Sequence, residues 1–265
     1  MPLTVEPLRI AAGLALSAAI ALFALRKGAL STSGAGAAVL LATTSTAAGW
    51  SWAWLLISFF VSATALSKAG ESAKRARTND VVDKGGDRDM WQVLANGSVF
   101  AAMALTSLFI HSDIVKAAAA AALAASTADT WATEIGTLSR SMPRSILSMN
   151  VVPRGTSGGV TVTGIIASVA GAGFIALVTM LLGWPPIVAL AALAGGFAGS
   201  ALDSLLGAAV QEKRWCEQCG RGTERAVHTC GEKTIYAGGI AGLNNDLVNF
   251  LSSIGGAAVG CLCLL

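Results

Sequence analysis

The chain has 265 residues, of which 54% are hydrophobic and only 12% are charged, about half the charged share of an ordinary soluble domain. Its 18 Lys and Arg and 15 Asp and Glu give a net charge of +3, which argues against the concentrated basic surface of a nucleic-acid-binding protein. The composition excludes an intrinsically disordered chain, and the length with only 5 cysteines excludes a small disulfide scaffold. The 30 glycines and the mean hydropathy of +0.66 indicate helices packed closely in lipid.

The charged residues are clustered along the chain. Residues 28–67, 90–112 and 155–202 contain no Asp, Glu, Lys or Arg, and these runs are 40, 23 and 48 residues long. A helix that crosses a bilayer needs about 20 apolar residues, so the first and third runs each accommodate two. We therefore predict an all-α, polytopic integral membrane bundle of about eight transmembrane helices, forming a single domain over residues 1–265. The expected spans are 8–25, 32–49, 50–67, 91–111, 114–137, 159–183, 186–210 and 235–263.

The first expected span could be a cleaved signal peptide or a retained anchor. Arg26 and Lys27 follow it directly, and no clean cleavage site is present, which favours the anchor. The second span is the least secure, because residues 35–49 are rich in Ala, Ser and Thr. Further along, the turn between the sixth and seventh spans is clearly marked by Gly183-Trp184-Pro185-Pro186.

Three polar stretches, 68–90, 138–158 and 211–234, separate the spans and fall on one side of the membrane in the eight-helix arrangement. Together with the short loop at residues 26–27 they hold sixteen of the 18 basic residues. Positively charged loops remain in the cytoplasm, so we expect these loops to be cytoplasmic and both termini to lie outside. The expected location is the cell membrane of a prokaryote, with the active site facing the cytoplasm.

Four acidic residues fall within the expected spans, namely Asp129, Glu134, Asp203 and Asp246. A charge inside a bilayer costs at least about 2.5–3.5 kcal/mol, so each requires a function or a partner. Asp129 and Asp203 lie about eight residues, and Asp246 about eleven, from a loop, which predicts a shared depth of ~12–17 Å. No basic residue is expected at that depth. The convergence therefore favours a shared Mg²⁺, which prefers carboxylate and phosphate oxygens. Proton-pathway acids, or single acids hydrogen-bonded to Ser and Thr, are the alternatives.

Two groups of polar residues could complete such a site. Asn96, Asn245 and Asn249 add amides to the neighbouring spans. A glycine-rich stretch lies at the start of the sixth span, where a helix N-terminus suits a phosphate group, although it does not match the P-loop pattern and can equally be only a turn. The residues expected to bind phosphate are Lys68, Arg154, Gly155, Thr156, Ser157, Gly158 and Gly159. Further residues of loop 68–90 that could add to a nucleotide pocket are Asn79, Lys84, Gly85, Gly86 and Arg88.

The third polar loop contains Cys216 and Cys219, followed by His228 and Cys230. Three thiols and one imidazole are the ligands that structural Zn²⁺ takes, and free or redox-active thiols are the alternative. In either case we expect the cluster to shape the loop. The sequence contains no HExxH motif and no GxGxxG motif after a strand, and the placement of its two histidines disfavours a Ser-His-Asp triad.

Five stretches resemble the phytyl-phosphate kinase family and follow one another in that family's order between about Ser67 and Ser253. They are residues 91–97, 129–136, 152–161, 199–208 and 244–249. The resemblance implies transfer of a phosphoryl group from CTP or another NTP to an isoprenoid monophosphate, such as phytyl, geranylgeranyl or farnesyl phosphate. Related dolichol-kinase-like proteins carry the motif DxxAxxxGxxxG. Here Asp129, Ala132 and Gly136 match it, and Arg140 replaces its last glycine.

The residues and the resemblance together give one hypothesis. The four carboxylates hold Mg²⁺ on the nucleotide, the three Asn side chains surround the lipid phosphate, and Lys68 with residues 154–159 neutralises phosphate charge. The expected partners are the bilayer, an isoprenoid phosphate and a nucleotide. Three other hypotheses compete with it: a kinase of the free isoprenoid alcohol, a transporter of an anionic solute, and a scaffold protein.

Overall fold

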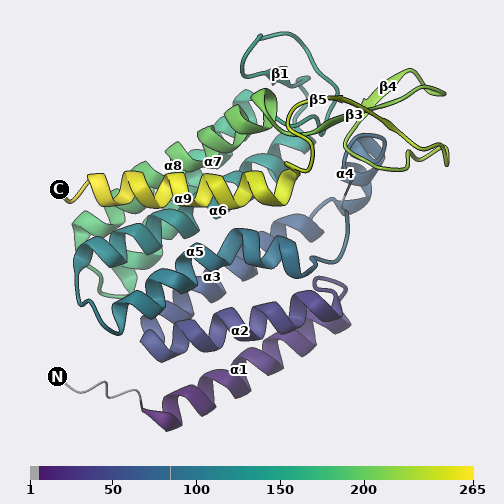
Figure 1. The fold of residues 1–265 in the computed structure, drawn as a ribbon. Coiled ribbons are helices and arrows are strands. Elements are labelled where there is room, and N and C mark those ends of the chain that lie inside the picture. The colour runs from purple at the N-terminus through teal and green to yellow at the C-terminus, as the bar shows by residue number, and fades with distance from the viewer. Residues whose placement is uncertain (1–5, 84) are drawn as a thin grey trace.

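The computed structural model describes residues 6–83 and 85–265, so Lys84 lies outside the described residues. Within these described residues, eight long helices and one short helix, α4, form a bundle in which successive long helices run back and forth (Figure 1). All eight expected spans are confirmed as helices, including the Ala-, Ser- and Thr-rich second one. The helices are α1 (Pro7–Arg26), α2 (Thr32–Ala48), α3 (Trp50–Lys68), α4 (Glu71–Thr78), α5 (Met90–Ser107), α6 (Asp113–Leu138), α7 (Val162–Leu181), α8 (Pro186–Ala209) and α9 (Asn245–Leu262).

Four of the described helices, α1, α3, α7 and α8, are by themselves long and apolar enough to cross a membrane. Of the other long helices, α2 has only 17 residues, whereas α5, α6 and α9 carry Asn or Asp within their length. These polar helices pack against the apolar ones, which completes a polytopic helical membrane protein.

Helix α6 is the centre of the bundle and packs against α3, α5, α7, α8 and α9. Every residue from Ala117 to Ala128 is buried, and most of them are alanines. Such small side chains let neighbouring backbones approach closely, which is how helices associate in lipid. Gly199 of α8 shows how close the approach is, because a Cβ atom built there would lie 2.4 Å from the Cβ of Ala125. The low hydropathy of α6 therefore reflects burial among other helices rather than exposure to water.

This packing predicts that Gly199→Ala destabilises the bundle, because the added methyl group overlaps α6. Overpacking of a core typically costs about 1–3 kcal/mol. Gly173→Ala in α7 is the matched control, since nothing lies within 4 Å of its added Cβ. Alanine there should leave the melting temperature unchanged or raise it slightly, because it reduces the freedom of the unfolded chain. The check is thermal unfolding of both variants in one detergent, and equal shifts would contradict the close α6–α8 contact.

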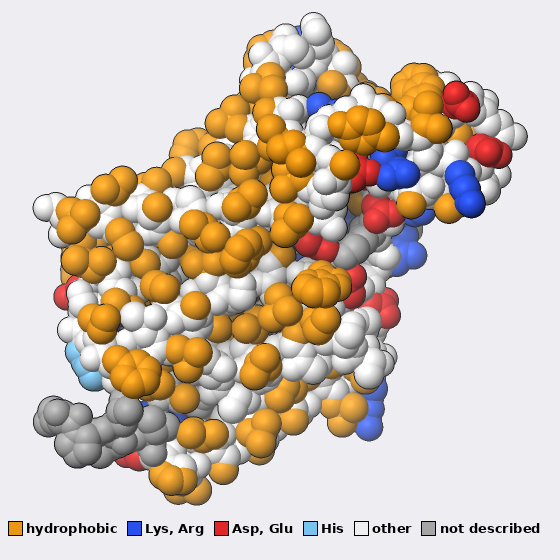
Figure 2. All heavy atoms as spheres, viewed as in Figure 1, with side chains coloured by type: hydrophobic (Ala, Val, Ile, Leu, Met, Phe, Trp, Pro, Cys, Tyr) orange, Lys and Arg blue, Asp and Glu red, His pale blue; other side chains and the backbone are white. Residues whose placement is uncertain are grey.

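One end of the bundle carries α4 and two small antiparallel sheets, and we call it the polar end (Figure 1). The first sheet pairs β1 (Arg144–Ser145) with β2 (Gly159–Val160), and the second has the order β4-β3-β5, from Arg221–Thr223, Lys213–Cys216 and Ile235–Gly238. The α1–α2 connection also lies there. Lys and Arg side chains gather over this end, as Figure 2 shows. The expected grouping of the basic loops on one side is therefore confirmed.

One expected boundary is wrong, and one expected loop contains a helix. The last span was expected at 235–263, but residues 235–238 pair with β3 and the helix begins at Asn245. It begins there because the side chain of Asn244 accepts a hydrogen bond from the Leu247 backbone at 3.1 Å, which is an N-cap. The loop expected at 68–90 likewise contains the helix α4.

Candidate functional site

A cavity of about 780 Å³ opens at the polar end between the helix ends and the connecting segments. Every residue that the sequence placed in the magnesium and phosphate site lines this one cavity. These residues are Lys68, Asn96, Asp129, Glu134, Arg154, Gly155, Thr156, Ser157, Gly158, Gly159, Asp203, Asn245, Asp246 and Asn249. They come from five helices and one loop, so the fold brings together polar groups that lie far apart in the sequence.

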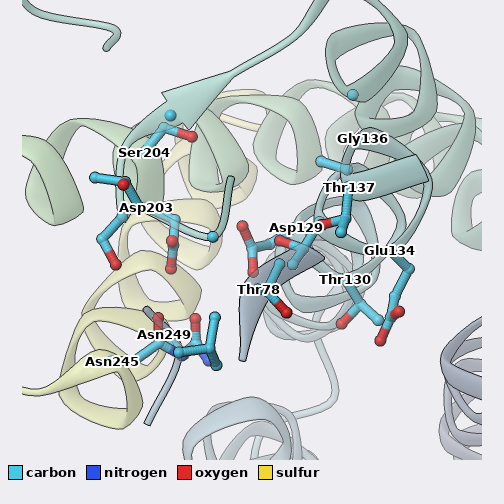
Figure 3. A pocket seen from close by; sticks show the side chains of 18 of the residues that line it. Thr78, Asp129, Thr130, Glu134, Gly136, Thr137, Asp203, Ser204, Asn245 and Asn249 are labelled. Carbon is cyan, nitrogen blue, oxygen red and sulfur yellow. The ribbon is translucent and has the colours of Figure 1, made fainter. Parts of the chain in front are cut away.

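Asp129 of α6 and Asp203 of α8 form the centre of the cavity, and Figure 3 shows them on facing walls. Their carboxyl groups lie close enough to interact electrostatically, and Ser252 of α9 lies beside Asp203. Asp203 is 9% exposed, and its Oδ2 atom has no hydrogen-bond partner among the described residues. No salt bridge within residues 6–83 and 85–265 reaches either acid. Two adjacent carboxylates without a positive partner suit a bound cation.

Helix α9 contributes polar side chains from its first turns. Asp246 is buried in the first turn, so the expectation that it lies eleven residues deep is wrong, because the helix starts ten residues later than expected. It still lines the cavity with Asn245 and Asn249, which lie one turn apart and appear beside each other in Figure 3. The carboxylate therefore reaches the site from the end of the bundle rather than from its interior.

Asn96 stands where α5, α6 and α9 meet. The side-chain amide nitrogen of Asn96 donates to the Gln92 backbone carbonyl at 2.9 Å. The backbone carbonyl of Asn96 accepts from the Ser126 hydroxyl, also at 2.9 Å. The hydroxyls of Ser126 and Ser253 lie 3.0 Å apart. This chain of hydrogen bonds fixes the backbone around Asn96, which lines the wall of the cavity.

Glu134 is neutralised by a basic residue, contrary to the expectation that none lies near the acids. Lys74 of α4 donates to the Oε2 atom of Glu134, while the Ser67 hydroxyl donates to Oε1 at 2.5 Å. Lys74 is only 8% exposed, and its ammonium group also donates to the carbonyls of Leu66 at 2.7 Å and Ser67 at 2.8 Å. Glu134 thus joins α3, α4 and α6. Both carboxylate oxygens of Glu134 already accept hydrogen bonds, so only the other three carboxylates remain as candidate magnesium ligands.

The glycine-rich loop is held against the bundle at several points. Arg154 donates to the carbonyls of Thr137 and Arg140, both at 3.2 Å, and so binds the carboxyl end of α6. Gly158 has φ +74°, and a Cβ atom built there would lie 2.6 Å from the Ser204 carbonyl of α8. The N-terminus of α7 is capped by Thr161, whose hydroxyl accepts from the Gly164 backbone at 3.0 Å. The glycines are therefore required for packing, while the loop still lines the cavity.

Glu224 is a residue of the site that the sequence analysis did not identify. It follows β4 and enters the cavity, where Ser157 of the glycine-rich loop hydrogen-bonds to it through both its hydroxyl and its backbone. The Glu224 backbone donates to the Val81 carbonyl at 2.9 Å, which ties the three-stranded sheet to the segment after α4. Burial raises the pKa of Glu224 to about 7, and the charge of Asp83 adds to the effect.

This raised pKa predicts that the stability of the protein falls as the pH increases. The folded state holds a proton on Glu224 up to about pH 7, whereas the unfolded state releases it near 4.5, so the contribution is complete below pH 4.5 and is lost as the pH rises through 7. Glu224→Gln, which stays neutral, should therefore melt a few degrees above the natural protein at pH 8 and show no such advantage at pH 5. The control is Glu217→Gln at an exposed position. An advantage of equal size at both pH values would contradict this account.

The predicted cysteine cluster lies outside this cavity, in the three-stranded sheet. Cys216, Cys219, His228 and Cys230 each direct one ligand atom to a common point, and these atoms all lie within 4.8 Å of one another. The fold thus brings together the four residues that the sequence singled out as candidate zinc ligands.

A second, smaller cavity of about 100 Å³ borders the first. It lies between α1, α2, α3 and α5, and most of its walls are apolar side chains such as Leu16, Leu41 and Phe60. Its polar residues include Arg88, Gln92, Asn96 and Thr130, which also line the large cavity. An apolar space inside the bundle thus meets the polar site along a shared wall.

Comparison with known proteins places this arrangement in a family. Residues 15–257 match the family described as "Integral membrane protein DUF92". The chain is 33% identical over 208 residues to "Uncharacterized membrane protein MJ0933" of Methanocaldococcus jannaschii, a match that covers 78% of this chain and 74% of that protein. It is 29% identical over 264 residues to "Protein PGR" of Arabidopsis thaliana, covering 89% of this chain and 90% of that protein. No solved structure matches the chain.

Proposed function

This chain belongs to the DUF92 family of integral membrane proteins, and from that premise we propose that it is a phosphotransferase. The proposed reaction converts an isoprenoid monophosphate to the diphosphate with CTP or another NTP as donor. The observation that carries the proposal is the pair Asp129 and Asp203, two adjacent carboxylates without a basic partner among the described residues, in a polar cavity that borders an apolar one. The resemblance to phytyl-phosphate kinases supports the same reaction.

The residues at the centre of the cavity fit a magnesium ion. The unpartnered Oδ2 atom of buried Asp203 needs a positive group, and carboxylates are the ligands that Mg²⁺ prefers. In this proposal Asp129, Asp203 and Asp246 hold the ion. When bound, Mg²⁺ would supply charge neutralisation on the triphosphate.

The remaining polar side chains would bind and orient the two substrates. Amides of Asn96, Asn245 and Asn249 suit the oxygens of the lipid phosphate, and Lys68 adds positive charge at the rim of the cavity. An oxygen of the lipid phosphate attacks the γ-phosphorus, the bond from that phosphorus to the β,γ-bridging oxygen breaks, and the nucleoside diphosphate leaves. The attacking phosphate is already ionised near neutral pH. The chain therefore has to position charges rather than supply a general base.

The apolar cavity supports a lipid as the acceptor. The part of the isoprenoid chain next to the phosphate would lie among α1, α2, α3 and α5, with the phosphate at the wall that Gln92 and Asn96 share between the two cavities. A cavity of about 100 Å³ is too small for a whole tail, so the rest of the chain would extend between the helices into the bilayer. The tail would then stay in an apolar environment while the phosphate meets the nucleotide. Because basic loops remain in the cytoplasm, we propose that the polar end faces that side. The archaeal and plant relatives leave the kind of organism open.

The experiment that tests the proposal compares acceptors. The full chain in detergent is incubated with Mg²⁺, a labelled NTP, and either phytyl, geranylgeranyl and farnesyl monophosphates or the three matching alcohols. We expect label in lipid diphosphates, and only from the monophosphates. Label that enters the alcohols instead would overturn the proposal in favour of an alcohol kinase. No label with any NTP, together with flux of phosphorylated solutes in proteoliposomes, would overturn it in favour of a transporter.

A further inference from the structure

The three-stranded sheet at the polar end lacks an apolar core. Among the described residues 211–244, the buried ones are Gln211, Cys216, Thr223, His228 and Thr234. The large apolar residues Trp215, Val227, Ile235 and Tyr236 are all exposed. Strands of three and four residues cannot be held together by so little burial, and small units of this kind are commonly stabilised by a metal or a disulfide.

Two tight turns of this unit bring the four metal-type side chains together. Cys216 ends β3, and Cys219 lies in the turn to β4. His228 and Cys230 lie in a second turn, closed by hydrogen bonds from the Gly231 backbone to the His228 carbonyl and from the His228 backbone to the Glu232 carbonyl, both at 2.9 Å. The pairs thus come from separate turns that face each other.

The spacing of the ligand atoms fits one tetrahedral ion. The Sγ atoms of Cys216 and Cys230 are 3.6 Å apart, and the Nδ1 atom of His228 is 3.3 Å from the Cys230 sulfur. Zn²⁺ with bonds of about 2.3 Å to sulfur sets its ligands about 3.7 Å apart. His228 is 4% exposed, and its other ring nitrogen, Nε2, is buried without a hydrogen-bond partner among the described residues. The Nδ1 atom is the ring atom that faces the cysteine sulfurs, and with Nδ1 bound to a metal the ring proton would lie on Nε2.

We propose that Cys216, Cys219, His228 and Cys230 bind one structural Zn²⁺, which takes the place of a core in the three-stranded sheet. All four positions are occupied by side chains, which is the arrangement of a structural rather than a catalytic zinc site. Metal binding would then be part of the folding of residues 211–244.

The zinc would also hold one wall of the large cavity. Besides Glu224, which meets Ser157, the sheet contacts the segment after α4 through Arg225, whose Nε atom lies 3.1 Å from the Asn79 carbonyl and 3.0 Å from the Val82 carbonyl. Thr229, between two of the ligands, donates to Asp80 at 2.8 Å. Loss of the metal should therefore release residues 211–244 from this segment. This inference does not depend on the proposed phosphotransfer.

The test is the metal content of the tag-free full chain, purified in detergent and measured by plasma mass spectrometry. We expect one zinc per chain, and near-complete loss in Cys219→Ser and Cys230→Ser. Cys261→Ser in α9 is the matched control and should keep the zinc, because Cys261 lies outside the cluster. Cys219→His, which replaces one zinc ligand by another, should also keep it.

A second readout uses the natural sequence alone, so that it does not depend on the folding of the variants. Exchange with Co²⁺ should give the visible absorption of a tetrahedral cobalt–thiolate site, and a chelator should increase proteolysis within residues 211–244 while the helices stay protected. Zinc that is absent from the natural protein, zinc that persists in both serine variants, or a disulfide between Cys216 and Cys230 found by mass spectrometry would each overturn the proposal.

Discussion

Asp203→Asn should lower the rate of phosphoryl transfer by a factor of about 10²–10³, the size of effect seen when a group that stabilises transition-state charge is removed. The replacement keeps the shape of the side chain and removes one of the two adjacent carboxylates. Asp129→Asn should act in the same way. Both variants should also need more Mg²⁺ for half-maximal activity. Initial rates over a range of Mg²⁺ concentrations provide the measurement.

The melting temperatures of the two Asn variants separate a functional role for this pair from a purely structural one. Neither acid has a basic partner among the described residues, so the Asn variants lose only repulsion and a desolvated charge. Their melting temperatures should therefore equal or exceed that of the natural protein. Asp113→Asn is the control, since Asp113 pairs with Lys116 at 2.9 Å in the first turn of α6, at the opposite end of that helix from the cavity. Near-normal activity in both Asp129→Asn and Asp203→Asn would contradict the assignment of a magnesium site to this pair.

Lys74→Met should destabilise the fold by about 3–5 kcal/mol, the usual cost of leaving one member of a buried ion pair without its partner. The Lys74 side chain is 9% exposed, and its removal leaves the Glu134 carboxylate with the Ser67 hydroxyl and the more distant charge of Arg88, which itself donates to Ser67. Adding Glu134→Gln to this variant should restore much of the loss, because the unpaired charge is then gone. Denaturant unfolding of the two single variants and the double variant in one detergent measures this coupling.

An exposed ion pair between the end of α3 and the start of α4 gives the comparison for this measurement. Lys68 meets Glu71 at 3.3 Å, with 41% and 34% of the two side chains exposed. Exposed pairs contribute little, so Lys68→Met should change the stability far less than Lys74→Met. If the two lysine variants unfold alike, then the buried pair does not join α3, α4 and α6 as the structure indicates.

The eight long helices could be predicted because runs without charge are long and the basic residues fall between them. Hydropathy alone does not separate a membrane helix from a short strand, and this is why the last span was placed ten residues too early. Ile235 and Tyr236 are apolar enough for a span, yet they pair with β3 at the polar end. The Asn244 cap and the glycines before it mark the true start of the helix.

The acidic residues of the site could be predicted from the sequence, whereas the residues that contact them across the fold could not. Unpaired acids within helices stand out in a sequence, and Asp129 and Asp203 do meet. Lys74 was not identified because α4 is a short, polar helix that resembles a solvated loop, and nothing in its sequence shows that one lysine turns inward to Glu134. Glu224 was missed for a similar reason. It lies in a charged loop, and only the tertiary contact with Ser157 sets it apart from its neighbours.

The fate of the transferred phosphoryl group decides whether the chain makes a lipid diphosphate. The full chain is supplied with Mg²⁺, an NTP labelled only in its γ-phosphate, and an isoprenoid monophosphate, and the lipid product is separated and examined by phosphorus NMR and mass spectrometry. We predict a lipid diphosphate whose distal phosphate carries the label, together with one nucleoside diphosphate per product. Release of labelled inorganic phosphate with the lipid monophosphate unchanged would contradict it.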